Sequence, residues 1–295
     1  MIGTVRAAAA AILVSILATP AWAANTDWKK VDEAMGRQGA MQPGEVYKFS
    51  FPRSDLTVTV DGVPVKPALT LGSWVAFSGS GEHATVMGDL VLTEDEVAPV
   101  MRQLVQDGLA VTAVHNHILR ASPATVYMHI AGMGEPARLG KAIHGALAKS
   151  KTPLEATPTS SNQDVGLDTA ALEQALGQKG KASGGVYQFS IPRAETIKDG
   201  DMAVPPAMGT AIAINFQSAG AGKAATTGDF VLLPEEVNPV IQALLANGIE
   251  VTALHTHMLA EEPRLYFMHF WGVDQPDKLA AGLKAALAKV NIAHS

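Results

Sequence analysis

The chain has 295 residues, a net charge of −6, 47% hydrophobic residues and no cysteine. The composition is that of a globular protein with a sizeable core, and the length favours two domains. Without cysteine there is no disulfide, no thiolate metal ligand and no lipidated N-terminal cysteine. No basic cluster offers the Lys/Arg footprint that a nucleic-acid partner needs. The sequence also lacks a Walker loop and a dinucleotide fingerprint, so we expect no nucleotide cofactor.

The first residues have the pattern of a secretory signal peptide over 1–23. Arg6 precedes an apolar run, Ala7–Ala18, and the small residues Ala21 and Ala23 fit an A-x-A cleavage pattern. The run is shorter than the roughly 20 residues that a bilayer span needs. We therefore expect cleavage near Ala23, a periplasmic or secreted protein, and no membrane anchor.

Most of the remaining sequence consists of two similar copies, which are offset by a constant 140 residues. Three matched pairs of segments show it: Val46–Arg53 and Val186–Arg193, Gly88–Leu92 and Gly228–Leu232, Glu96–Val100 and Glu236–Val240. An internal repeat of this length indicates a duplicated domain rather than a solenoid unit. We expect repeat domains at 27–149 and 167–290, joined by a Pro/Ser/Thr-rich linker at 150–166 and packed on each other.

Each repeat predicts the same elements in the same order. In the first repeat we expect helices at 27–37, 93–106 and 135–149, and strands at 46–51, 56–60, 73–79, 84–92, 111–119 and 125–131. Thr93 and Glu96 form a capping box that opens the middle helix. The order ββββαββα predicts two tandem α+β domains, each a mostly antiparallel sheet with helices packed on it.

Six of the nine histidines lie in two copies of one pattern, His-x-His followed by a third His twelve residues on: His115, His117, His129 and His255, His257, His269. On a strand, side chains at i and i+2 share a face. In a hairpin, His129 joins that face if paired residue numbers sum to 244 or 246, and points away if they sum to 245. The sequence leaves this register open.

Three convergent imidazoles are typical of a divalent-metal site, with zinc the first candidate and copper the second. Such an ion leaves a position for water or substrate, which suggests a metal-dependent hydrolase or lyase. The carboxylates retained in both repeats are candidate bases, Asp229 and Glu236, or partners of the ligands, Asp89 and Glu96. Three arginines are candidate anion ligands: Arg53, Arg193 and Arg264.

Two other interpretations stay open. The histidines line the cleft of a non-catalytic module that binds an unknown small molecule, or they are hydrogen-bonded core residues with a structural role. Met128 and Met268 precede a histidine and suggest copper, but they fall on the opposite strand face, where core packing is expected. For Arg53 and Arg193, an exposed position at the end of a strand is expected over anion binding.

The segments Gly228-Asp229-Phe230, Val251–His257 and Phe267–Gly272 resemble the LppY/LpqO family. The resemblance implies an exported bacterial protein built on a domain of unestablished function. Members are often lipoproteins, but this sequence has no cysteine at the cleavage site, so lipid anchoring is not carried over. The first repeat departs from the pattern, with Ala124 in place of Arg264 and Ala131 in place of Trp271. We therefore expect the second repeat to hold the better-formed site.

Overall fold

The computed structural model of the chain describes residues 26–155 and 164–293. The expected signal peptide lies outside these residues, as do positions 156–163 of the expected linker. Among the helices in the described part of the chain, none has the length and apolarity to cross a membrane.

Each half of the molecule contains one six-stranded antiparallel sheet. In the first half the strands run in the order β1 (Ala40–Gln42), β2 (Val46–Pro52), β5 (Gly72–Ser80), β6 (His83–Leu92), β9 (Val126–Gly134), β7 (Ala110–His115). Its helices are α1 (Trp28–Met35), α2 (Pro67–Thr70), α3 (Glu94–Gln106) and α4 (Pro136–Leu147). A small sheet of β4 (Val63–Val65), β3 (Val58–Val60) and β8 (Ala121–Ser122) lies beside it.

The second half repeats this plan. Its sheet runs β10 (Gly180–Ser183), β11 (Val186–Pro192), β14 (Ala211–Gly220), β15 (Lys223–Leu232), β18 (Tyr266–Asp274), β16 (Glu250–His255). The helices are α5 (Thr169–Leu176), η1 (Pro206–Met208), α6 (Pro234–Ala246) and α7 (Pro276–Leu287). The small sheet consists of β13 (Met202–Ala203), β12 (Lys198–Asp199) and β17 (Glu261–Glu262).

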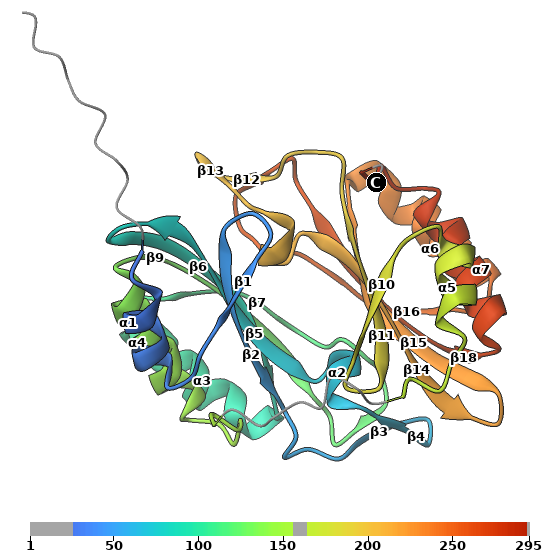
Figure 1. Ribbon diagram of the computed structural model, residues 1–295, viewed down its shortest axis with the longest axis horizontal. Helices are drawn as coiled ribbons and strands as arrows, with labels where there is room; N and C mark the ends of the chain where they lie inside the picture. Colours follow the sequence, from blue (N-terminus) through green and yellow to red (C-terminus); the bar gives the residue numbers. More distant parts are fainter. Residues whose placement is uncertain (1–25, 156–163, 294–295) are drawn as a thin grey trace, which may run out of the picture.

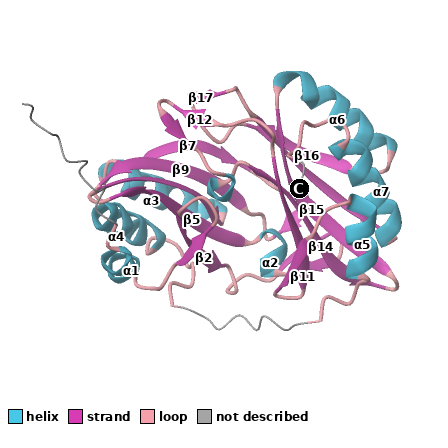
Figure 2. Cartoon of the chain, turned by 45° about the horizontal axis from the view of Figure 1, so that its top comes forward, coloured by secondary structure: helices cyan, strands magenta, loops and turns pink. Residues whose placement is uncertain are grey.

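The two sheets form the middle of the molecule, and the long helices cover its two outer sides. Figure 1 shows α1, α3 and α4 on one side and α5, α6 and α7 on the other, and Figure 2 shows the same layers from a second direction. In β9, Met128 and Ile130 belong to the apolar cluster that includes α4, whereas Tyr127 belongs to a cluster with residues of the other half. Alternate residues of each strand therefore face either the helices or the other repeat.

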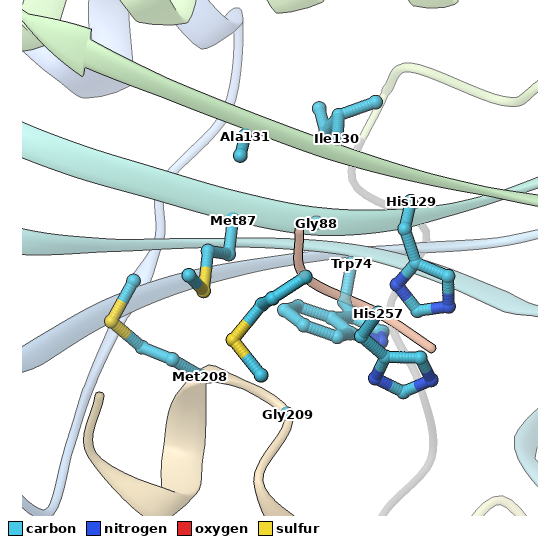
Figure 3. Close-up of a pocket in the computed structure, with 10 residues that line it drawn as sticks. Trp74, Met87, Gly88, His129, Ile130, Ala131, Met208, Gly209 and His257 are labelled. Carbon is cyan, nitrogen blue, oxygen red and sulfur yellow. The ribbon is translucent and has the colours of Figure 1, made fainter. Parts of the chain in front are cut away.

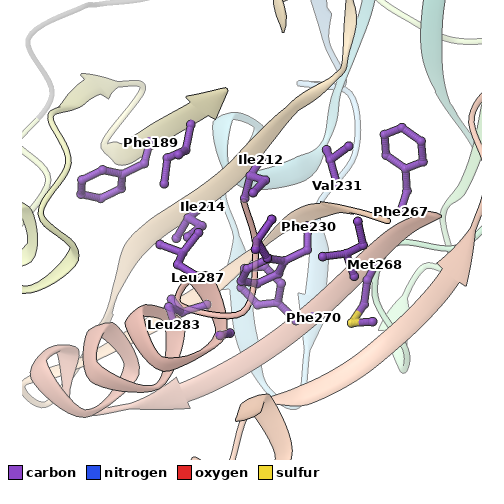
Figure 4. Close-up of a cluster of buried hydrophobic side chains, with 14 of the residues drawn as sticks. Phe189, Ile212, Ile214, Phe230, Val231, Phe267, Met268, Phe270, Leu283 and Leu287 are labelled. Carbon is purple, nitrogen blue, oxygen red and sulfur yellow. The ribbon is translucent and has the colours of Figure 1, made fainter. Parts of the chain in front are cut away.

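The helix-facing core fixes which way β18 presents its residues. Phe230, Phe270, Leu283 and Leu287 are at most 4% exposed and pack together between β15, β18 and α7 (Figure 4). Burying each such side chain contributes about 1.5–3 kcal/mol. Because Phe270 faces the helices, its neighbour His269 faces the other repeat.

The predicted fold class, two tandem α+β domains, is confirmed. Two expected strands differ. The strand predicted at 111–119 ends at His115, because the chain then leaves the sheet and its next strand, β8, pairs with β3. The strand predicted at 56–60 is one arm of the β3–β4 hairpin, which belongs to the small sheet.

Side-chain to backbone hydrogen bonds tie the halves together. The short helix α2 lies against β14 and β15, where Asn215 Nδ2 donates to Leu69 O at 3.0 Å and Gln188 Nε2 donates to Ala68 O at 2.8 Å. Near the histidines, Asn116 Nδ2 donates to Thr252 O at 3.0 Å. These contacts hold the loop of one repeat against the sheet of the other.

Candidate metal centre

A β-bulge decides the direction of the histidines. Strands β7 and β9 pair Val111 with Ile130, a sum of 111 + 130 = 241, and then Ala113 with His129, a sum of 113 + 129 = 242. Thr112 is the extra residue of the bulge. The even sum beyond it places His129 on the face of Ala113 and His115, so the rings converge.

The same shift occurs in the second repeat, between Val251 and Ala253, and pairs Ala253 with His269. Neither expected sum, 244 or 246, occurs. The parity that convergence requires does occur, and the residue opposite His115 is Tyr127 rather than His129.

His117 and His257 lie just beyond their strands and are held by an aromatic partner. The His117 ring stacks on Tyr127 with centroids 3.3 Å apart, and its Nδ1 is 3.2 Å from Thr70 Oγ1. The His257 ring stacks on Phe267 at 3.4 Å. Contacts within its own repeat therefore orient each of these two rings.

The six rings form one cluster between the repeats. Three pairs stack across the boundary: His115 on His255 at 3.5 Å, His117 on His269 at 3.7 Å, and His129 on His257 at 3.7 Å between centroids. Each position of one trio thus meets a partner from the other, as a pseudo-two-fold axis requires. The six rings therefore lie together between the repeats, and a metal site in each repeat stays a prediction, because one convergent group consists of first-repeat rings alone.

Two groups of rings bring their nitrogens within 4.8 Å of one another. One is the first-repeat trio, His115, His117 and His129. The other joins the second-repeat trio, His255, His257 and His269, to His115. The expectation that the second repeat holds the better-formed site stays a prediction, and its group includes a ring of the first repeat.

Asp89 and Asp229 complete the donor set. Asp89 pairs with His129 across β6 and β9, and its Oδ2 lies 3.4 Å from His117 Nε2. Asp229 Oδ2 lies 3.4 Å from His257 Nε2. These distances exceed an ordinary hydrogen bond. A tetrahedral ion with ligand bonds of about 2.1 Å holds neighbouring donor atoms about 3.4 Å apart, which is the observed spacing.

Burial sets the protonation of the cluster. It lowers the pKa of His115 to about 4 and of His269 to about 3, and the neighbouring imidazoles add to the lowering at His117 and His257. Neutral rings stack without charge repulsion and each keeps one lone pair. Burial also raises the pKa of Asp89 to about 7, against the opposing charge of Lys48.

Two backbone carbonyls orient the lone pairs. His269 Nδ1 lies 2.8 Å from Gly228 O, and His115 Nδ1 lies 3.0 Å from Asn116 O. A neutral ring that donates from Nδ1 has its lone pair on Nε2, which is the usual arrangement behind a metal-binding histidine. The Nε2 atoms of both rings are buried and have no hydrogen-bond partner among the described residues.

A cavity lies beside His129 and His257 and is shown in Figure 3. Its volume is about 10 Å³, and besides these rings it is lined chiefly by Trp74, Ala131 and three methionines, Met87, Met208 and Met258. A space of this size holds about one water molecule. An organic substrate therefore does not fit beside this part of the cluster.

The other predicted site residues lie in ion pairs of their own. Arg53 Nη1 is 2.7 Å from Glu96, and Arg193 Nη1 is 2.6 Å from Glu236. The Glu236 carboxylate also accepts hydrogen bonds from the backbone N–H groups of Leu233 and Asn291. The predictions of Glu236 as a base and of Glu96 as a partner of the ligands are therefore wrong. Both carboxylates bind an arginine and cap the N-terminus of a helix.

The structure also differs from the predictions made for the arginines. Arg53 is 0% and Arg193 5% exposed, so neither is the exposed strand-end residue that was expected, and their guanidinium groups are committed to carboxylates. Arg264 is half exposed and bonds to Glu261 and to Leu259 O. Within the described residues, the hydrogen bonds and ion pairs of the three guanidinium groups go to carboxylates and backbone carbonyls and to no histidine ring.

Sequence reasoning missed Trp74 and the three methionines of the cavity. They lie on β5, on β6, in η1 and directly after His257, so no short motif joins them. The repeat alignment held a signal for them, since none of the three methionines has a methionine at the position 140 residues away.

Comparison with known proteins identifies the domain but no activity. A family profile described as "Domain of Unknown Function (DUF1259)" matches residues 29–149 and again residues 170–289. It supports the expected duplication, and the likeness to LppY/LpqO proteins stays a resemblance. No curated protein matches the chain.

Solved structures with some likeness have very low similarity. They include the trimeric bacterial microcompartment shell protein PduB, 14% identical over 85% of this chain and 89% of that chain, with a TM-score of 0.20. The regulatory subunit of aspartate kinase from Thermus thermophilus is 14% identical over 73% of this chain and 95% of that chain, with a TM-score of 0.19. EtuB from Clostridium kluyveri is 8% identical over 84% of this chain and 90% of that chain, with a TM-score of 0.19. Scores this low carry no argument.

Proposed function

The chain belongs to the Domain of Unknown Function (DUF1259) family through both of its halves, and we propose that it binds divalent transition-metal ions in one centre shared by its two repeats. The ligands are drawn from the six clustered histidines, and Asp89 and Asp229 either complete the coordination or orient the rings. Family membership brings no reaction with it, so the proposal depends on the site alone.

One observation carries the proposal. Seven ring nitrogens are buried without a hydrogen-bond partner among the described residues: Nε2 of His115, His117, His129, His257 and His269, and both ring nitrogens of His255. Oδ1 of Asp89 and of Asp229 is in the same state. Histidines kept for packing normally satisfy such atoms, because leaving one unpaired costs about 1–3 kcal/mol. Converging unpaired donors are what a metal ion satisfies.

The donor set favours zinc, and copper next. Neutral imidazole and carboxylate ligands suit both ions. When bound, such an ion supplies Lewis acidity and activates a coordinated water. The small volume of the cavity favours a role in holding or passing on the ion over a hydrolase or lyase acting on an organic substrate. We also propose that the protein acts after export, on the strength of the signal-peptide pattern over 1–23.

Elemental analysis of the untagged chain tests the proposal. After incubation with Zn(II) or Cu(II) and extensive dialysis, we expect about one ion or more per chain, as for a preformed ligand cage. His255→Phe keeps a stacking ring but removes the nitrogens, so it should lower the metal content while the chain stays folded. The control is His83→Ala, because His83 is exposed and has no counterpart in the other repeat.

Two results would decide against it. A wild-type content below about a tenth of an ion per chain after loading excludes a preformed site. Unchanged metal content in His255→Phe, together with a large loss of thermal stability, would instead show that the rings are packing residues.

A further inference from the structure

The two ends of the histidine cluster are not equivalent. At one end His129 stacks on His257, and the cavity of Figure 3 lies beside this pair. At the other end His117 stacks on His269. The pseudo-two-fold axis relates the two pairs, so the positions 140 residues away show what occupies the equivalent place.

Those equivalent positions carry different chemistry. Met87, Met208 and Met258 line the cavity, and their counterparts are Thr227, Ala68 and Ile118. Ala131 faces the cavity, whereas its counterpart is Trp271, which is 3% exposed and packs in the cluster that includes Ile118 and Leu69. The bulky indole thus occupies one end, and the other keeps a small cavity that is lined by three methionines.

We propose that the cavity beside His129 and His257 is a second metal site, selective for a soft monovalent ion, Cu(I). The thioethers of Met87, Met208 and Met258 supply its donors, and His129 and His257 add theirs when these rings do not hold the divalent ion, because a neutral imidazole has one lone pair. This inference deepens the proposed function and rests on it for the two shared histidines. It differs in the ion, the ligands and the restriction to one end of the cluster.

Ligand type and size both favour this ion. Thioether sulfur is a soft ligand that selects Cu(I) over harder ions, and imidazole also binds copper. A volume of about 10 Å³ admits a single bare ion and excludes an organic ligand. Figure 3 shows the residues that line the cavity, with Met87 and Met208 on one side, His129 and His257 on the other, and Trp74 between them. If the methionines were present solely as flexible filler, they would be expected to close the space rather than to leave it.

Charged groups of both signs lie near the cavity, since Asp89 Oδ1 lies 3.8 Å from His129 Nε2 and Asp229 Oδ2 lies 3.4 Å from His257 Nε2. Lys48 Nζ lies 4.1 Å from the centroid of Trp74, which lines the cavity, and donates to Ala207 O at 3.1 Å. Its counterpart in the second repeat is the neutral Gln188. The selectivity for Cu(I) therefore rests on the thioether ligands rather than on local charge.

The test replaces each methionine by the residue that the other repeat uses. The full chain with Met87→Thr, Met208→Ala and Met258→Ile is compared with wild type for Cu(I) affinity, by anaerobic competition with bicinchoninate. We expect the affinity to fall by about tenfold or more, because soft ligands are lost, with Zn(II) binding unchanged. The matched control is Met133→Val, another twin replacement, since Met133 is 75% exposed and lies outside the cavity.

A second measurement does not depend on the triple variant folding. In wild-type protein labelled with ¹³C at the methionine methyl groups, one equivalent of Ag(I), a redox-inert substitute for Cu(I), should shift the resonances of Met87, Met208 and Met258 and leave Met133 in place. If Ag(I) leaves these three resonances unmoved, or if the triple variant binds Cu(I) as tightly as wild type, the proposal is overturned. Zn(II) binding with silent methionine resonances refutes this inference alone. Shifted methionines without any Zn(II) binding refute the shared divalent centre and retain the soft site.

Discussion

The imidazole rings of His115 and His255 stack with their centroids 3.5 Å apart, and the two residues hold the same position in the two repeats. The pseudo-two-fold axis therefore passes between them, at the middle of the histidine cluster. His115 also belongs to both groups of rings whose nitrogens converge. A single residue thus connects the ligands of one repeat to those of the other, and this relationship makes several expectations specific.

Zinc should stabilise the folded chain by joining its repeats. A ligand that binds the folded state alone adds about 2.7 kcal/mol at 100 times its Kd. We expect Tm in differential scanning calorimetry to rise with Zn(II) for wild type and for His83→Ala. His115→Phe should lose most of the rise, since His115 serves both groups. An equal rise in all three proteins would place the zinc elsewhere.

Without metal, the chain should lose stability as the pH falls below about 6.5. In the folded state, burial lowers the pKa of His115 to about 4 and that of His269 to about 3. At pH values between these and the pKa of the unfolded chain, the unfolded state therefore binds more protons than the folded state. Stability then rises with pH up to the unfolded pKa. Asp89, with its pKa raised to about 7, contributes in the opposite sense as the pH rises from its unfolded pKa to about 7. Since six histidines oppose two aspartates, the net trend follows the histidines.

Urea unfolding at pH 5.0, 6.0 and 7.0 with a chelator present measures this trend. His115→Phe/His255→Phe should flatten it, because two of the titrating rings are removed. A stability that is independent of pH over this range would show that the rings are not held neutral by burial.

Zinc binding should release protons, and the source should be the aspartates. Burial raises the pKa of Asp89 to about 7, so this carboxyl carries a proton in part at pH 6, whereas the rings are already neutral. Burial also raises the pKa of Asp229 well above its usual range. Calorimetric titration at pH 6 in buffers of different ionisation enthalpy counts the protons. Asp89→Asn should reduce the count, and Asp61→Asn, an exposed acid, should not. An unchanged count in Asp89→Asn would leave this carboxyl out of the binding reaction.

Breaking the Arg53–Glu96 pair should destabilise the fold without removing the metal. Arg53→Met leaves the nearly buried Glu96 carboxylate without its cation, which costs about 3–5 kcal/mol for a buried pair. Arg102→Met, at an exposed position on α3, should have a small effect. Chemical denaturation measures the loss, and elemental analysis should find the metal content of the folded fraction unchanged. Loss of metal at full stability would return this pair to the site.

Much of this architecture can be predicted from the sequence, because it depends on local periodicity and on repetition. The 140-residue offset reveals the duplication, alternation and capping signals give the α+β elements, and the spacing of His115, His117 and His129 marks the centre. Asp89 could be singled out because it recurs as Asp229. Each of these features lies within one repeat or in the match between the two.

The tertiary structure decided which rings meet and what surrounds them. Whether His129 faces His115 depends on one bulged residue, Thr112, and a change of a single residue in register turns a side chain to the other face of the sheet. The stacking of His115 on His255 and the cavity beside Met258 arise where surfaces distant in sequence come together. Local sequence sets which way a strand alternates, but packing between the two sheets determines what each face meets.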